Sequence, residues 1–319
     1  MSTASRVPET WELTGDDARL TLASTGRVRL LKDALVRLRA ADGTSHSRSL
    51  AFVLSLVLVQ GLIVIVGFAA AFGSSTVSAV TVDIIRTAAP GPAGDFLTGA
   101  VKQANTVGGQ DRFLVLLIGL VGLTITATTT MGQLERGLNR IYGVERDRPF
   151  VEKYRLAFLL AVSAGAVIAA SFVLLAFGRT LGISGDGAIA TIWSLARWPL
   201  GVGLLAVGLA ILFRWAPRRR QPSHAWLAFG STVAVTLLTV VTLVLALAFR
   251  VSSSFGDTYG PLAGIVALQF WTLVSALSIF YGAAVAAQLE AVRAGSPAPA
   301  SRVREADDTP ARQRAATIA

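Results

Sequence analysis

The stretch LAFVLSLVLVQGLIVIVGFAAAF, residues Leu50–Phe72, decides the fold because it carries no charged side chain. A helix rises about 1.5 Å per residue and the hydrocarbon core of a bilayer is about 30 Å thick, so about twenty such residues cross it. Five further apolar runs follow: Phe113–Met131, Ala157–Gly178, Trp198–Trp215, Ala225–Phe249 and Leu262–Leu289. The sequence therefore predicts an all-α, polytopic membrane protein with six transmembrane helices and no ionisable residue in mid-membrane.

The composition excludes a soluble domain. Of the 319 residues, 53% are hydrophobic and only 15% are charged, and the mean hydropathy is +0.61. A soluble fold of this size could not bury so much apolar surface. The chain also contains no cysteine, which excludes disulfides, thiolate metal sites and cysteine nucleophiles.

The distribution of basic residues predicts the orientation. Of the 29 Lys and Arg residues, 23 lie in the N-terminal arm, after the second and fourth apolar runs, and in the C-terminal tail. Basic residues near the ends of membrane helices remain cytoplasmic. Both termini are therefore expected in the cytoplasm, and the net charge of +10 reflects membrane topology rather than nucleic-acid binding.

The segments outside the membrane domain (50–292) differ in character. Residues 1–24 are expected to form a disordered arm and residues 293–319 a disordered tail. Residues 25–49 predict an amphipathic juxtamembrane helix, whose apolar positions recur at helical spacing: Val28, Leu31, Leu35 and Leu38. Two interpretations remain equal, because this helix suits either the inner leaflet or the protein's own cytoplasmic loops.

The sequence also predicts an outer cap and two stripes of small residues for helix packing. The long connection 73–112 predicts an outer cap of two short helices. Small residues recur every fourth position at Ala161, Gly165 and Ala169 and again at Ser278, Gly282 and Ala286. Such stripes favour close helix packing within the bundle, and the alternative is a face for a homo-oligomer.

No arrangement of residues for covalent chemistry is visible. The two histidines, His46 and His224, stand alone, and no Ser-His-Asp pattern, phosphate-binding glycine loop or paired carboxylate appears. We therefore expect no catalytic residues, no metal site and no cofactor, and the protein is not expected to be an enzyme.

Neutral polar residues offer the alternative of a binding cavity. Six of them fall at similar depth in the inner half of three helices: Thr128, Gln133, Ser231, Thr232, Tyr281 and Gln288. They predict a substrate cavity open to the cytoplasm, although Ser and Thr also bond to their own backbone or join helices.

Arginines gather near the same depth. A second set suits the phosphates of anionic lipids, because guanidinium groups pair two phosphate oxygens at once: Arg136, Arg140, Arg218, Arg219 and Arg220. The simpler interpretation is that they only fix the topology.

Two motifs resemble the YihY/virulence factor BrkB family of six-helix bacterial inner-membrane proteins. The first is LNRIY at Leu138–Tyr142, which includes Asn139. The second is YGPLAG, beginning at Tyr259 and Gly260 and followed by Trp271 and Gly282. From the residues alone, we expect Asn139 either to cap the second helix or to bridge backbone where that helix ends, and Tyr259-Gly260 to shape the turn into the sixth helix.

The resemblance implies a multi-pass protein of the bacterial inner (plasma) membrane with a role in envelope integrity. The leading hypothesis is a transporter-like or lipid-handling protein whose partners are the bilayer and its anionic lipids, without nucleic acid. The rival hypothesis is a non-transporting scaffold. Some members of the family carry a ribonuclease label. This sequence contains no carboxylate cluster for metal-assisted RNA cleavage, so we do not expect that activity.

The predicted topology can be tested with a reporter that is active only in the periplasm. Fused after Ala319 it should be silent, and inserted near Gly91 it should be active, because the 23-to-6 basic asymmetry keeps the termini inside. The opposite pattern would contradict the orientation.

Overall fold

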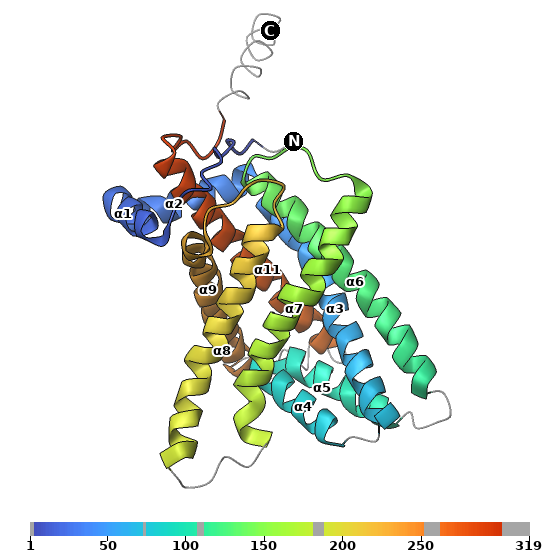
Figure 1. Cartoon of the computed structure of the whole chain (residues 1–319). Coiled ribbons are helices and arrows are strands. Elements are labelled where there is room, and N and C mark those ends of the chain that lie inside the picture. Colours follow the sequence, from blue (N-terminus) through green and yellow to red (C-terminus); the bar gives the residue numbers. More distant parts are fainter. Residues whose placement is uncertain (1–2, 73–74, 107–111, 181–187, 252–261, 302–319) are drawn as a thin grey trace, which may run out of the picture.

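The computed structural model describes residues 3–72, 75–106, 112–180, 188–251 and 262–301. This part of the chain is all-α, as predicted (Figure 1). Six of its helices are long and apolar enough to span a membrane, which confirms the predicted number. They are α3 (Gly43–Phe72), α6 (Arg112–Ile141), α7 (Phe150–Thr180), α8 (Ala188–Trp215), α9 (His224–Val251) and α11 (Ala263–Arg293).

Helix α8 is longer than the sequence predicted. It begins at Ala188 rather than at Trp198, so Arg197 lies inside the candidate span Thr191–Trp215. The added turns bring this arginine into the span near its start, and the expectation that no ionisable residue lies in mid-membrane stays a prediction. The guanidinium of Arg197 lies 5.8 Å from the centroid of the Trp198 ring, a cation–π arrangement that suits a charge near the membrane boundary.

The first and last described residues meet at one end of the bundle, which we call the terminal end. The backbone N–H of Ser301 donates to the carbonyl of Thr3 at 2.8 Å, and Ala4 and Ala300 form an antiparallel bridge. Residues 299–301 of the predicted disordered tail are thus paired with the N-terminal segment. Residues 302–319 lie outside the described residues.

The structure also differs from the predicted disordered arm, because residues Gly15–Thr25 form helix α1. The Asp17 carboxylate accepts hydrogen bonds from the backbone N–H of Thr14 at 3.0 Å and from its hydroxyl at 2.8 Å. These bonds close the first turn, as in a capping box. The pKa of Asp17 lies below its ordinary value, mainly because of these bonds.

Helix α2 (Arg27–Ala40) is the predicted juxtamembrane helix, and it packs on α11. Its buried face is not the expected one. Leu30, Ala34 and Leu38 are buried, whereas three of the four residues predicted to share the apolar face, Val28, Leu31 and Leu35, are exposed. The helix thus carries two apolar faces, and the fold uses only one of them.

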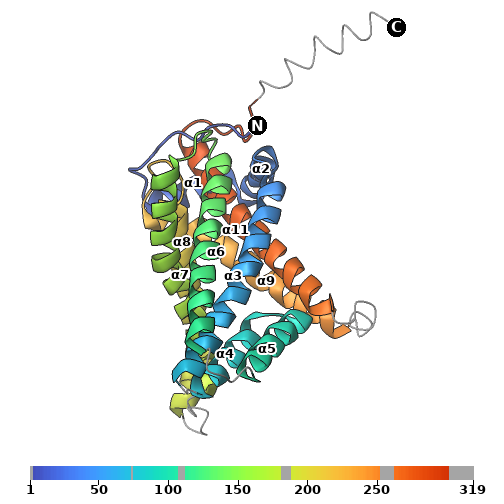
Figure 2. The same cartoon turned by 90° about the vertical axis from the view of Figure 1, so that its right-hand side faces the viewer.

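At the opposite end, which we call the cap end, lie α4 (Ser75–Ala88) and α5 (Gly91–Thr106), the two short helices expected there (Figure 2). Ile85 and Leu97 are buried from these helices against Leu245 of α9 and Trp271 of α11. The cap is therefore packed among the ends of the spans rather than laid over them.

Helices α9 and α11 cross closely through small residues. A Cβ placed at Gly282 would lie 2.5 Å from both the Cβ of Ala234 and the carbonyl oxygen of Gly230. Only glycine fits this crossing, so the small stripe on α11 joins helices within the bundle, as predicted. The stripe on α7 does not, because a Cβ at Gly165 would meet nothing within 4 Å and Ala169 is exposed.

The close approach of α9 and α11 at Gly282 can be tested with two glycine-to-alanine variants. Gly282→Ala should lower the free energy of unfolding by about 1–3 kcal/mol, because the neighbouring backbone must move to admit the methyl group. Gly165→Ala is the matched control and should be neutral or stabilising by up to about 1 kcal/mol, as for glycine to alanine in an open helix. Thermal unfolding of both variants in detergent measures the difference.

Candidate functional site

The structure gives four of the six polar residues predicted to line a cavity local positions on α9 and α6. The hydroxyls of Ser231 and Thr232 both donate to the carbonyl of Ala228, at 3.1 and 2.7 Å, and Thr232 is exposed. Thr128 and Gln133 are half-buried on α6. The two hydroxyls thus bond to their own backbone, which was the alternative to a cavity, and the shared cavity stays a prediction.

The other two members of that set bond to α2. The Tyr281 hydroxyl donates to the carbonyl of Leu31 at 3.0 Å, and the Gln288 side-chain oxygen accepts from Arg37 Nε at 2.8 Å. Both residues thus hold the juxtamembrane helix against α11. The polar groups of this chain are concentrated at the terminal end instead, in two networks.

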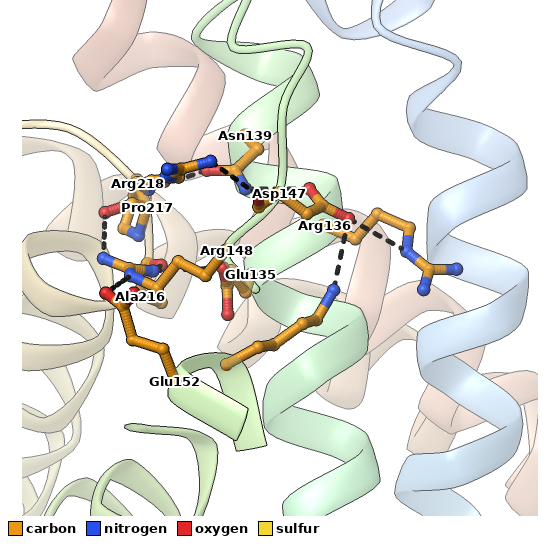
Figure 3. A network of polar contacts seen from close by, with 10 residues as sticks. Glu135, Arg136, Asn139, Asp147, Arg148, Glu152, Ala216, Pro217 and Arg218 are labelled. Carbon is orange, nitrogen blue, oxygen red and sulfur yellow. Dashed lines mark hydrogen bonds and ion pairs between the residues drawn. The ribbon is translucent and has the colours of Figure 1, made fainter. Parts of the chain in front are cut away.

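The first network is centred on Asn139 of α6, which is fully buried (Figure 3). Its side-chain oxygen accepts the backbone N–H of Arg218 at 2.8 Å, and its nitrogen donates to Asp147 at 3.0 Å. The predicted bridging of backbone by Asn139 is what the geometry shows. One amide thereby joins α6, the α6–α7 loop and the α8–α9 turn.

Asp147 collects positive charge around this amide. Lys153 Nζ lies 3.2 Å and Arg136 Nε 3.6 Å from its second oxygen (Figure 3). Burial raises the pKa of Asp147, but hydrogen bonds from Asn139 and Lys153 outweigh it and leave the pKa below the ordinary value. Asp147 is therefore ionised at neutral pH.

Arg148 completes the network on the other side. Its Nη1 lies 3.1 Å from the carboxylate of Glu135, which is 2% exposed, and its two terminal nitrogens donate to the carbonyls of Ala216 and Pro217 (Figure 3). Sequence reasoning passed over Arg148 and placed Glu135 only at a membrane edge. No spacing rule links an acid on α6 to a loop arginine and to the end of α8.

The second network surrounds Arg219. This side chain is 1% exposed and forms a two-pronged ion pair with Glu290 of α11, at 2.7 and 2.9 Å. Its guanidinium also lies 4.6 Å from the ring centroid of Tyr142 and donates to the carbonyl of Pro8. Glu290 in turn accepts the hydroxyl of Thr10 at 2.7 Å. The Arg219–Glu290 ion pair therefore joins the N-terminal segment, the α8–α9 turn and α11.

Arg37 extends this second network and was missed as a site residue. Besides Gln288, its guanidinium reaches the carbonyls of Ser5 at 2.8 Å and Ile141 at 3.3 Å. Burial lowers the pKa of Arg37 to about 10, which still leaves it charged at neutral pH. The sequence of α2 contains several basic residues and does not show which of them is buried. Only the tertiary structure shows that Arg37 faces inward.

The predicted lipid-contacting arginines fall into two groups. Arg219 is buried and paired, so its assignment as a lipid contact needs correction. Arg218 and Arg220 are exposed, and Arg136 is half-exposed. Arg140 donates to the carbonyls of Val144 and Glu145, and therefore holds the loop that follows α6.

The remaining motif residues have packing roles or lie outside the described part. Trp271 is buried among cap residues and donates its Nε1–H to the hydroxyl of Thr242 at 3.1 Å. Gly282 forms the α9–α11 crossing. Tyr259 and Gly260 lie outside the described residues.

The chain matches the profile of the family described as virulence factor BrkB over residues 34–306. It belongs to this family. The resemblance seen in the motifs at Asn139 and Trp271 is thereby confirmed, and the match covers all six spans.

Its relatives include membrane proteins of several bacteria. A protein of Bacillus subtilis named as ribonuclease-like, YfkH, is 25% identical over 81% of this chain and 94% of its own length. UPF0761 membrane proteins of Ralstonia nicotianae and Xanthomonas campestris are 27% and 26% identical over 56% and 86% of this chain. The chain spans 40% and 63% of those two relatives. No solved structure matches it.

Chemically, the two networks fix helix ends and loops to one another. Within the described ranges, no group of three or more histidine or acidic side chains could hold a metal ion. The buried ion pairs, carbonyl contacts and amide bridge leave the terminal end tightly connected, while exposed arginines surround it.

The Asn139 bridge can be tested by Asn139→Leu. This change keeps the approximate volume but leaves the Arg218 N–H and one Asp147 oxygen without their partner, so it should lower the free energy of unfolding by about 1–3 kcal/mol. Glu145→Gln, an exposed change in the same loop, is the control. Equal thermal unfolding curves for the two variants would contradict the bridging role.

Proposed function

We propose that this multi-pass BrkB-family protein handles anionic lipids or related anionic amphiphiles at the cytoplasmic leaflet of the bacterial inner membrane, in support of envelope integrity. The observation that carries the proposal is the outer face of α2. Four large apolar side chains there are 39–67% exposed although they lie on an ordered, packed helix: Val28, Leu31, Leu35 and Val36.

The depth of α2 supports contact with lipid. Measured from Ala263, a hydrocarbon core of about 30 Å takes about twenty residues of α11, so Tyr281 falls near its boundary. The hydrogen bond from Tyr281 to Leu31 holds α2 at that level. An apolar face at the membrane boundary gains free energy by entering the acyl region.

The charges on α2 favour anionic lipid. Exposed basic residues lie on this outer face or beside it: Lys32 and Arg39 are interspersed with its apolar residues, and Arg27 and Arg29 lie at its sides. A cytoplasmic leaflet with anionic headgroups attracts each such charge by about 1 kcal/mol at moderate salt. The 23-to-6 excess of basic residues supports a cytoplasmic location for the terminal end.

A second candidate function is a non-transporting scaffold of the envelope. It is favoured by the local backbone bonds of Ser231 and Thr232 and by the bridged networks around Asn139 and Arg219. Both candidates are non-enzymatic, and the name of the Bacillus subtilis relative is the reason to include an assay for RNA cleavage.

The lipid contact of α2 is testable because the chain contains no cysteine, so a single introduced thiol can be labelled. Leu31→Cys and Leu35→Cys, each carrying a polarity-sensitive fluorophore, should shift to the blue in vesicles containing phosphatidylglycerol, because the labels enter the acyl boundary. Glu9→Cys, on an exposed residue of the N-terminal segment, is the control.

The role of charge needs a separate variant. Replacing Arg29, Lys32 and Arg39 by Gln should weaken the binding of anionic lipid by about 1 kcal/mol per charge and reduce complementation of a deletion strain. Emission from labelled Leu31→Cys that matches the Glu9→Cys control in both neutral and anionic vesicles would contradict the proposal and leave the scaffold.

A further inference from the structure

The cluster around Arg219 buries more positive than negative charge. Arg37 and Glu290 are 0% exposed and the Arg219 side chain is 1% exposed. Two guanidinium groups therefore share one carboxylate, and the Tyr142 side chain interacts electrostatically with all three. A buried charge without a counterion is costly, so an excess cation at this place requires a physical reason.

Backbone carbonyls from the two terminal segments accept hydrogen bonds from both guanidinium groups, in addition to the Gln288 side-chain oxygen and the Ile141 carbonyl that Arg37 also reaches. Arg37 donates to the carbonyls of Ser5 and, at 3.5 Å, Ala298, and Arg219 donates to that of Pro8 at 2.9 Å. These oxygens surround guanidinium forks that match the oxygens of a phosphate or carboxylate. They are neutral, so they leave the charge uncompensated.

One donor at the centre of the cluster lacks a hydrogen-bond partner in the described part of the chain. It is Nε of Arg219, whose side chain is 1% exposed. The Tyr142 hydroxyl and the Gln221 side chain are also buried, but they lie close enough to bond to each other. Native proteins rarely leave a buried donor unsatisfied, so Arg219 offers a hydrogen bond to a ligand.

The segment Thr3–Thr14 closes the cluster from outside. It is held by the Ala4–Ala300 bridge, by the bond from Thr10 to Glu290 and by the buried side chain of Val7. Segments near chain termini are the parts of a fold that open at least cost in free energy. Opening this one would expose both guanidinium groups.

An approach from solvent already exists beside it. A surface hollow of about 380 Å³ is lined by Arg29, Asp33 and residues 297–300. Its wall includes Ala298, whose carbonyl accepts from Arg37. A single backbone segment therefore separates the hollow from the buried guanidinium.

We propose that Arg37 and Arg219 form a binding site for an oxyanion, a phosphate or carboxylate group, and that residues 3–14 close this site with carbonyl oxygens in the ligand's place. The site goes beyond the surface contact of α2 and does not depend on it. Its ligand is either a free anion or the headgroup of a lipid.

A reversible disulfide tests the closing segment. Bridged antiparallel residues have Cα atoms about 4.5–5.5 Å apart, a separation that a disulfide accepts, so Ala4→Cys/Ala300→Cys should lock the segment shut. Titration calorimetry with inorganic phosphate, and with vesicles of phosphatidic acid, should show binding in the reduced protein and at least about tenfold weaker binding in the oxidised one, as expected for loss of a charge-assisted contact.

The reduced form of the same polypeptide is the matched control, and thiol titration verifies the lock. Phosphate binding alone identifies a free anion, and binding of phosphatidic acid without phosphate identifies a headgroup. Equal binding in the locked and reduced forms, or no binding in either, overturns the proposal.

A second measurement changes the charge instead. Glu290→Gln removes the carboxylate that competes with the ligand, so the affinity for phosphate should rise, whereas Arg219→Gln/Glu290→Gln removes both charges and should abolish binding. Labelling of Val7→Cys, whose side chain is buried, should be faster with phosphate present, and labelling of exposed Glu9→Cys should not change. A lower affinity in Glu290→Gln would show that the pair is only structural.

Discussion

The absence of hydrogen-bonding partners in hydrocarbon is the constraint on which this structure depends. Within the bilayer each span must satisfy its own backbone, so the chain crosses as helices and its Ser and Thr hydroxyls turn back to carbonyls such as that of Ala228. Lipid also removes most of the gain from burying apolar surface between helices. Contacts between spans then come from close packing, as at Gly282, from single hydrogen bonds such as that of Trp271 to Thr242, and from the polar networks at the terminal end.

The polar links gather at the terminal end and have two different characters. The Asn139 network joins α6 to two loops through one neutral amide and surrounding ion pairs. The Arg219 network joins α11 to the N-terminal segment through a two-pronged ion pair in full burial. The first includes half-exposed side chains such as Arg136 and fixes geometry, whereas the second is buried, keeps one excess cation and is closed by the N-terminal segment.

The two ends of the molecule also differ in their surface. The face of α2 that does not pack on α11 stays exposed and carries apolar and basic residues, at the level where Tyr281 bonds to Leu31. The membrane function that we propose for this end would combine an exposed surface for lipid with a buried cluster for an anionic headgroup. The cap end, built from α4, α5 and Trp271, is apolar and closely packed.

The sequence by itself determined the number of spans, the place of the cap helices, the amphipathic helix and the family, because length, apolar runs and the motif around Asn139 are local properties. It gave no indication that Arg37 turns inward, that Arg219 pairs with Glu290 or that Thr3 meets Ser301. These contacts join residues that are 71 to 298 positions apart in the sequence. An arginine beside a membrane helix has the same sequence pattern whether it faces lipid or a carboxylate, and only the packing of helices decides which partner is near.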